Sequence, residues 1–112
     1  MNRFTLQTLL PGLQAKVLTG PEGVEITGCY ISDLLSDVLA HAKPGGLWAT
    51  VQTHRNVVSV ASTQDIAAVL FVCGRKPEQA VIAEAAEAGL VLVTTPLTTY
   101  EVAGKLWEAG IR

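Results

Sequence analysis

The stretch Ile66–Cys73, IAAVLFVC, decides the fold class of this chain. Apolar residues occupy its odd and its even positions, whereas a strand with one face in water alternates apolar with polar residues. Because successive side chains of a strand point to opposite faces, both faces of this strand are expected to be buried. Strands buried on both faces belong mostly to parallel sheets covered by helices. The stretch therefore predicts an α/β domain.

Other segments of the chain fit the same architecture. Four more are strand-length and rich in β-branched or aromatic residues: Ala15–Leu18, Val24–Ile31, Leu47–Val51 and Leu90–Val93. Four have helical character: Thr5–Leu10, Ser32–Lys43, Pro77–Gly89 and Thr98–Gly110. Glycine or proline separates most of these segments, as expected for the turns between elements.

Two of the helical segments carry specific end signals. Ser32 or Asp33 is predicted to cap the first, whose apolar stripe comprises Leu34, Leu35, Val38, Leu39 and Ala42. In the last segment, Thr98 and Glu101 have the spacing of a capping box, and Gly110 is the predicted stop.

The segment Arg55–Asp65, RNVVSVASTQD, is ambiguous because its valines favour a strand. A strand there would leave Leu47–Val51 and Ile66–Cys73 without the helical crossover that parallel neighbours need, so a helix is predicted. The whole chain, residues 1–112, is then one α/β domain. Its sheet is expected to be mainly parallel or mixed, with about five strands flanked by helices in three layers.

Composition limits the partners. The net charge is −2, and the eight lysines and arginines are scattered, with no cluster larger than Arg75–Lys76. Nucleic acid is therefore an unexpected partner, since phosphate backbones are bound by many cations on one face. No apolar run is long enough for a membrane span, and the start lacks the features of a signal peptide, so a cytoplasmic location is predicted. Cys29 and Cys73 are expected to be buried, reduced thiols.

The order of these segments resembles the DRTGG domain family. The most specific pieces are GCYISDLLSDVL (28–39), VCGRKPEQAVIAEAAEAG (72–89) and LVTTPLTTYEVAGKL (92–106). The family's members are small α/β modules related in fold to the N-terminal domain of HPr kinase/phosphorylase, and this chain is most similar to the stand-alone members. The resemblance implies a regulatory module rather than an enzyme.

The motif that names the family is degenerate in this chain. At its position stands THRN (53–56), in which Arg55 matches the motif's arginine, His54 falls where the aspartate would be, and both glycines are missing. No phosphate-binding loop of the form G-x-x-x-x-G-K-[ST] occurs either, so kinase activity is not expected.

Polar residues follow the predicted strands at their carboxyl ends, where open parallel sheets bind ligands. These candidate ligand-binding residues are Asp33, Thr53, His54, Arg55, Arg75, Lys76 and Thr95. Three of them are cations, and the helices that follow add the positive ends of their dipoles, which favours a small phosphorylated or carboxylate ligand. The alternative is that these residues only cap helices and make turns. Thr53 or His54 is the expected cap of the helix that begins near residue 55.

Catalysis, metal binding and cofactor binding lack a supporting pattern. His54 is the one plausible acid–base residue in the set, but no nucleophile is spaced to pair with it. Two histidines and two cysteines in separate segments do not form a metal site. No cofactor is expected.

The favoured interpretation is a non-catalytic regulatory module that senses a ligand or binds a protein, and that acts as a homodimer. Apolar helices such as Pro77–Gly89 and the tryptophan Trp107, in the last helical segment, are candidates for interface contacts. Trp48 is expected in the core. The alternatives are a small hydrolase or transferase that uses His54, and an accessory protein of a redox enzyme complex. The sequence identifies no protein partner.

Overall fold

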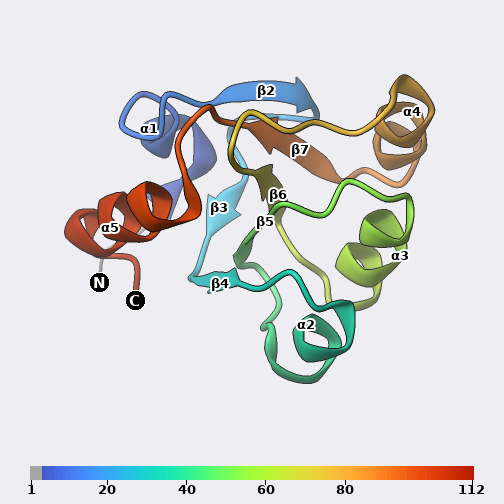
Figure 1. Ribbon diagram of the computed structural model, residues 1–112, viewed down its shortest axis with the longest axis horizontal. Coiled ribbons are helices and arrows are strands. Elements are labelled where there is room, and N and C mark those ends of the chain that lie inside the picture. Colours follow the sequence, from blue (N-terminus) through green and yellow to red (C-terminus); the bar gives the residue numbers. More distant parts are fainter. Residues whose placement is uncertain (1–3) are drawn as a thin grey trace.

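The computed structural model describes residues 4–112. Its main sheet has five strands in the order β2-β7-β6-β5-β4 (Figure 1). Parallel pairing joins β4 to β5, β5 to β6 and β6 to β7, whereas β2 runs antiparallel to β7. The strands are β2 (Lys16–Thr19), β4 (Cys29–Ile31), β5 (Leu47–Thr50), β6 (Ala68–Phe71) and β7 (Val91–Thr94). The mixed α/β sheet predicted from the sequence is confirmed.

Helices cover both faces of this sheet (Figure 1). Each parallel connection contains one helix, and these three helices share one face: α2 (Leu35–His41), α3 (Asn56–Thr63) and α4 (Gln79–Glu87). The other face is covered by α1 (Leu6–Leu9) and α5 (Thr99–Ala109). The result is the predicted three-layer arrangement.

The central strand β6 has all four side chains buried. Ala68 and Leu70 belong to the core on the α1 and α5 side, whereas Val69 and Phe71 belong to the core under α2, α3 and α4. Trp48 of β5 is also fully buried, as predicted. The apolar run that predicted a parallel sheet therefore serves two cores at once.

The predicted strand Val24–Ile31 is wrong as one element. It is divided into β3 (Glu25–Ile26), which pairs antiparallel with β1 (Phe4–Thr5) in a separate two-stranded sheet, and β4. The break lies at Thr27, whose N–H donates to the carbonyl of Gly45 and whose hydroxyl donates to that of Pro44. Gly45 has a φ of +79°, and a Cβ there would lie 2.9 Å from the Thr27 hydroxyl oxygen. Tertiary hydrogen bonds to this turn thus replace strand pairing.

The start of α2 also differs from the prediction. The residue before the helix is Leu34, and neither Ser32 nor Asp33 occupies the cap position. Ser32 instead accepts a hydrogen bond from the Leu34 N–H at 3.2 Å. Val38 and Ala42 are buried as expected, but Leu34 and Leu39 are exposed.

The valine-rich segment is helix α3, as predicted, against the β preference of its residues. Val57, Val58, Val60 and Ala61 are buried in the core beneath α2, α3 and α4. Burial of these four side chains and the need for a crossover between β5 and β6 outweigh intrinsic propensity, which is a weak effect per residue.

At the start of α5, the predicted capping box is present. The Thr98 hydroxyl accepts from the Glu101 N–H at 3.2 Å, and the Glu101 carboxylate accepts from the Thr98 N–H at 3.0 Å. The bond from the Thr98 backbone, followed by that from its hydroxyl, holds the pKa of Glu101 below its usual value. The helix ends at Gly110 with a left-handed φ of 99°, also as predicted.

Replacing the cap should destabilise the protein measurably. Thr98→Ala removes the acceptor of the Glu101 N–H, and we expect the free energy of unfolding to fall by about 1 kcal/mol, whereas Thr98→Ser should retain most of it. Because the pKa of Glu101 is lowered in the folded state, its contribution is complete above the ordinary carboxyl pKa and is lost as the pH falls through the lowered value. Urea unfolding at pH 7 and at pH 3 measures both effects. Equal stability of Thr98→Ala and wild type at pH 7 would contradict this account.

Candidate functional site

A hollow of about 480 Å³ lies where the chain leaves the carboxyl ends of β5 and β6. It brings together five of the residues proposed from the sequence: Thr53, His54, Arg55, Arg75 and Lys76. Its remaining lining residues are Val51, Gln52, Glu78 and Val81. Neighbouring parallel strands end at the same edge of the sheet, and this is why two turns that are distant in sequence border one surface.

Asp33 does not line the hollow but forms hydrogen bonds with residues 50–52, at the end of β5 and directly after it. One carboxylate oxygen accepts hydrogen bonds from the Thr50 hydroxyl at 2.9 Å and from the Val51 N–H at 2.8 Å. The backbone carbonyl of Asp33 accepts a further bond from the Gln52 side-chain amide at 3.0 Å. Asp33 therefore fixes the first residues after β5 rather than lining the hollow.

The cap position of helix α3 is occupied by Arg55, so neither Thr53 nor His54 is its cap as predicted, but the His54 ring bonds to the start of the helix. The ring Nδ1 of His54 lies 3.1 Å from the N–H of Asn56, the first helical residue, and accepts this hydrogen bond, which requires the Nε2–H tautomer of the neutral ring. The carbonyls of His54 and Arg55 accept from the N–H groups of Val57 and Val58. The start of α3 therefore contributes its dipole to the hollow, but its first N–H groups already have partners.

Arg55 forms an ion pair across the α3–α4 boundary. Its Nη2 lies 3.0 Å from an oxygen of Glu84, and the two side chains are 69% and 41% exposed. Exposed pairs of this kind stabilise a fold by at most about 1 kcal/mol. An anion that enters the hollow meets an arginine whose charge is already partly neutralised by Glu84.

Arg75 and Lys76 follow a tight turn after β6. Cys73 and Gly74 both adopt left-handed backbone conformations, with φ values of 60° and 70°. Their N–H groups donate to the carbonyls of Leu97 and Thr95, and the Thr94 hydroxyl donates to the Arg75 carbonyl at 2.6 Å. The backbone of Arg75 is thus held in place while its side chain remains exposed and unpaired within residues 4–112.

Thr95 lies away from the hollow and is fully buried. Its hydroxyl donates to the Leu13 carbonyl and accepts from the Leu97 N–H at 3.1 Å. These bonds tie the segment after β7 to the segment after α1. Thr95 has the burial and partners of a structural residue.

Two polar lining residues, Gln52 and Glu78, are missing from the sequence prediction. Gln52 stands next to the predicted residues Thr53 and His54, so its position after β5 was a usable signal. Glu78 lies directly before α4 and adds a carboxylate to a mainly cationic surface. No pattern in the sequence distinguishes Glu78 from the other glutamates of that helix.

The two cysteines differ from the expectation of two buried thiols. Cys73 is exposed, in the turn after β6, and Cys29 is partly buried in β4. Burial raises the pKa of the Cys29 thiol to about 12, so it is a poor nucleophile at neutral pH. Within residues 4–112, no three histidine, cysteine, aspartate or glutamate side chains are grouped as a metal site requires. None of the described helices combines the length and the apolar character that crossing a membrane demands.

Substitution of Thr95 tests its structural role. Thr95→Val removes the hydroxyl and leaves the buried Leu13 carbonyl and Leu97 N–H without this partner, so we expect a loss of roughly 1–3 kcal/mol in the free energy of unfolding. Thermal and urea unfolding measure the loss, and Thr53→Val, on the rim of the hollow, is the matched control. A Thr95→Val protein as stable as wild type would show that these bonds contribute nothing.

Comparison with known proteins supports the fold. No protein-family model matches the chain, and no curated protein matches its sequence. Among solved structures it is similar to the CBS and DRTGG domains of the regulatory region of Clostridium perfringens pyrophosphatase, complexed with the activator diadenosine tetraphosphate. The TM-score is 0.73 at 12% sequence identity, and the match covers 91% of this chain but 45% of that one. At this identity the likeness concerns the fold alone, and it supports the DRTGG-like fold that the sequence resemblance implied.

Proposed function

We propose that this chain is a regulatory module that senses a small anionic ligand in the hollow at the carboxyl ends of β5 and β6. The observation that carries the proposal is the convergence of Arg55, Arg75 and Lys76 from two separate turns onto one surface. Arginine binds phosphate and carboxylate groups through paired, charge-assisted hydrogen bonds. The volume of the hollow lies in the range of small-molecule sites.

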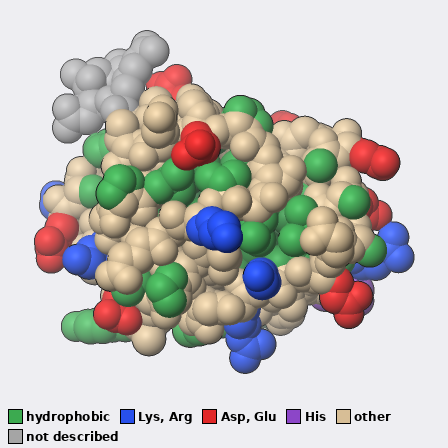
Figure 2. Space-filling view, turned by 90° about the horizontal axis from the view of Figure 1, so that it is seen from above, with side chains coloured by type: hydrophobic (Ala, Val, Ile, Leu, Met, Phe, Trp, Pro, Cys, Tyr) green, Lys and Arg blue, Asp and Glu red, His purple; other side chains and the backbone are tan. Residues whose placement is uncertain are grey.

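The distribution of charge favours a small anion over a polyanion. The face of the molecule in Figure 2 carries separate lysine and arginine side chains near its middle, rather than a continuous basic band. Long phosphate backbones are bound by many cations along one face, whereas a phosphate group needs two or three donors. The similar structure was solved with diadenosine tetraphosphate, which makes polyphosphate nucleotides the first ligands to test.

A non-catalytic role is the simpler interpretation of His54. Its Nδ1 is engaged with the α3 backbone, and Asp33, the one carboxylate among the residues proposed from the sequence, bonds to Thr50 and Val51 instead. A hydrolase or transferase needs a base that is held toward a nucleophile, and the hydrogen bonds of His54 do not provide this. The similar solved structure is a regulatory region, which agrees with a sensing role.

Homodimer formation is part of the proposal. Four large apolar side chains are exposed among the described residues: Leu34, Leu39, Tyr100 and Trp107. Tyr100 and Trp107 are separated by two turns on the same face of α5, and the Arg112 guanidinium lies 4.5 Å from the centroid of the Trp107 ring. The exposed parts of these two rings form a stripe that a second copy or another protein can cover. The cytoplasmic location, and the absence of nucleic-acid and membrane partners, stay predictions from the sequence.

Arg75 should be the main determinant of ligand affinity, because its side chain has no competing partner. We expect a ligand such as diadenosine tetraphosphate, ATP or inorganic phosphate to raise the melting temperature. Arg75→Ala should weaken its binding roughly 10- to 100-fold, as for loss of a charge-assisted hydrogen bond. Isothermal titration calorimetry measures the change, and Lys105→Ala, on the exposed side of α5, is the charge-matched control. Equal losses in both variants, or no binding of any of these anions, would count against the site.

Glu84 should act as a competitor for Arg55. Glu84→Gln removes the negative charge with little change in shape, so we expect anion affinity to rise by roughly two- to fivefold, in keeping with a weak exposed ion pair. Arg55→Ala should lower the affinity and abolish the effect of Glu84→Gln. Titrations of the two single variants and the double variant test this, and they should be repeated at high salt, which screens the pair. Unchanged affinity in Glu84→Gln would mean that the ligand does not use Arg55.

A further inference from the structure

Among the described residues, 4–112, strand β4 ends the main sheet and has no pairing strand on its outer side. In its parallel ladder with β5, the Leu47 N–H donates to the carbonyl of Gly28 at 2.9 Å, and the Ser32 N–H donates to that of Ala49 at 3.3 Å. Only alternate residues of a parallel strand bond to a given neighbour, so residues 28, 30 and 32 serve β5. The N–H and C=O groups of Cys29 and Ile31 therefore point away from the sheet.

The two edges of the sheet differ in how well they are protected against the addition of another strand. At the other edge, β2 contains an irregularity in its register between Val17 and Thr19 and begins with the exposed Lys16. A bulge and an edge lysine are common means of preventing strand addition. Strand β4 is Cys-Tyr-Ile, with no charge, no proline and a regular register. Figure 1 shows it at the end of the sheet between α5 and α2.

We propose that two copies of the chain join antiparallel through β4, so that their sheets become continuous. This inference rests on the homodimer of the proposed function and names its interface. The positions of the free backbone groups fix the register. Cys29 of one copy exchanges hydrogen bonds with Ile31 of the other, and the two Tyr30 residues face each other across the two-fold axis. In this register every outward N–H and C=O of β4 finds a partner.

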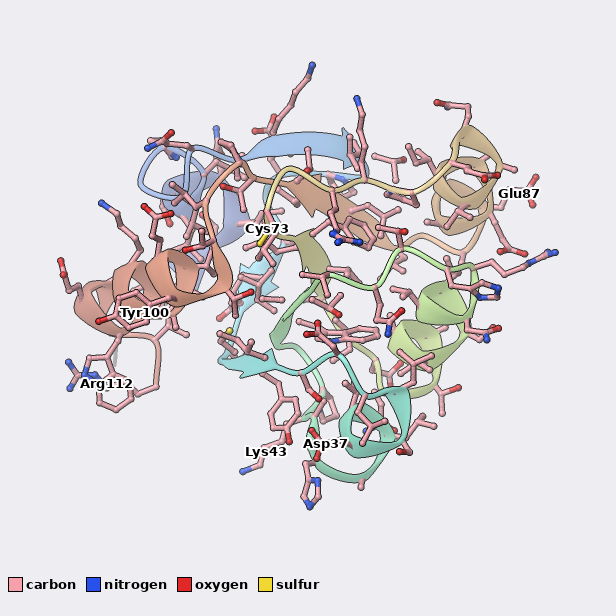
Figure 3. The ribbon with its side chains drawn as sticks, viewed as in Figure 1. Asp37, Lys43, Cys73, Glu87, Tyr100 and Arg112 are labelled. Atoms are coloured by element: carbon pink, nitrogen blue, oxygen red, sulfur yellow. The ribbon has the colours of Figure 1, made fainter. Side chains whose placement is uncertain are left out.

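The charges beside β4 favour the antiparallel arrangement. A second hollow, of about 450 Å³, lies at the amino end of the strand, and Lys43 and Arg112 both line it. Neither cation has an ion-pair partner in residues 4–112, and Figure 3 shows both in the lower part of the view. The Arg112 guanidinium lies 4.5 Å from the centroid of the Trp107 ring and donates to the Trp107 carbonyl at 3.3 Å. Parallel pairing would place the cations of the two copies together. Antiparallel pairing separates the cations of the two copies. It brings Lys43 and Arg112 of each copy toward segment 32–34 of the other copy, which contains Asp33 and the exposed Leu34.

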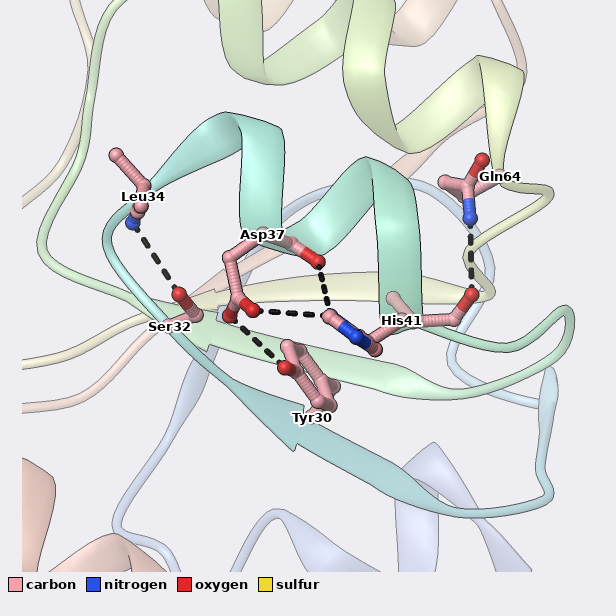
Figure 4. A network of polar contacts seen from close by, with 7 residues as sticks. Tyr30, Ser32, Leu34, Asp37, His41 and Gln64 are labelled. Carbon is pink, nitrogen blue, oxygen red and sulfur yellow. Dashed lines mark hydrogen bonds and ion pairs between the residues drawn. The ribbon is translucent and has the colours of Figure 1, made fainter.

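The side chain of Tyr30, which would face the Tyr30 of the other copy, is fixed by contacts within its own chain (Figure 4). Its hydroxyl donates to the Asp37 carboxylate at 2.8 Å, and the same carboxylate contacts His41 Nδ1 at 3.0 Å. The Tyr30 and His41 rings stack with centroids 6.4 Å apart. A side chain fixed by these contacts loses little conformational entropy when a second tyrosine packs against it.

A disulfide trap tests the register directly. Facing residues at a site without ladder hydrogen bonds have Cα atoms about 4.5 Å apart, within the range of a disulfide. With Cys29→Ala and Cys73→Ser in the background, Tyr30→Cys should therefore form a covalent dimer under mild oxidation, seen on a non-reducing gel. Ser59→Cys in the same background, an exposed position of α3, should not. Equal cross-linking of both variants, or none in a folded Tyr30→Cys protein, would overturn the proposed register.

The wild-type protein provides a second test that does not depend on a variant folding. The amides of Cys29 and Ile31 should exchange with solvent rapidly in dilute protein and become protected as the concentration rises, measured by NMR. The amide of Lys16, in the opposite edge strand, should not change. Rapid exchange of the Cys29 and Ile31 amides in a sample that sediments as a dimer would place the interface elsewhere. That result would overturn this inference while leaving the homodimer in place.

The variant Ile31→Pro tests whether the homodimer forms through the edge strand β4. Proline removes an N–H that β5 does not use, so the monomer keeps its ladder, whereas the dimer loses its bonds at this residue. We expect sedimentation to show a monomer for Ile31→Pro and a dimer for wild type and Ile31→Val, with circular dichroism confirming that each is folded. A wild-type monomer at 100 µM would overturn the homodimer as well as this interface. Anion binding, measured separately on folded Ile31→Pro, reports on the ligand hollow alone.

Discussion

The burial of β6 on both faces is the constraint on which the rest of the structure depends. Ala68 and Leu70 lie in one core while Val69 and Phe71 lie in the other, so neither face of this strand can be left in water. Its neighbours β5 and β7 run parallel to it, and a parallel connection must cross a face of the sheet. Helices α3 and α4 make these crossings and cover one core, and α1 and α5 cover the other.

This arrangement also determines where ligand-binding chemistry can occur. All parallel strands end at the same edge, so the turn after β5 and the turn after β6 must lie side by side. Polar groups in the segments after β5, β6 and β7 have one of two roles, according to whether they are buried or exposed. Buried ones need hydrogen-bond partners, and Thr95 is used entirely in this way. Exposed ones such as Arg75 and Lys76 keep their donors for solvent or for a ligand.

An open sheet leaves two edges, and the chain treats them differently. The irregular register and the lysine of β2 are features that disfavour further pairing at one edge, while among residues 4–112 the regular, uncharged β4 has unpaired backbone groups at the other. The ligand hollow is built from the segments after β5 and β6, whereas β4 lies at the end of the strand order. The proposed ligand site and the proposed dimer interface therefore lie in different parts of the sheet, and Asp33 alone is named in both.

The sequence by itself determined the fold class, most of the elements and the grouping of five candidate residues. The doubly buried run at Ile66–Cys73 required a parallel sheet, and that requirement made Arg55–Asp65 a helix despite its valines. The Thr98–Glu101 cap was also predictable, because its hydrogen bonds are local to a few residues. Placing Thr53, His54, Arg55, Arg75 and Lys76 together needed only the rule that parallel strands end at one edge.

Only the tertiary structure decided which polar residues are free. Asp33 and Thr95 follow strands as the others do, but their partners, Val51 and Leu13, are distant in sequence, so no local pattern reveals them. The same holds for the division of Val24–Ile31, since Thr27 is drawn from the strand by the carbonyls of Pro44 and Gly45. The Arg55–Glu84 pair depends on how α3 sits beside α4. Periodicity and capping are local properties of the chain, whereas the partner of a polar group is set by which segments the folded core brings into contact.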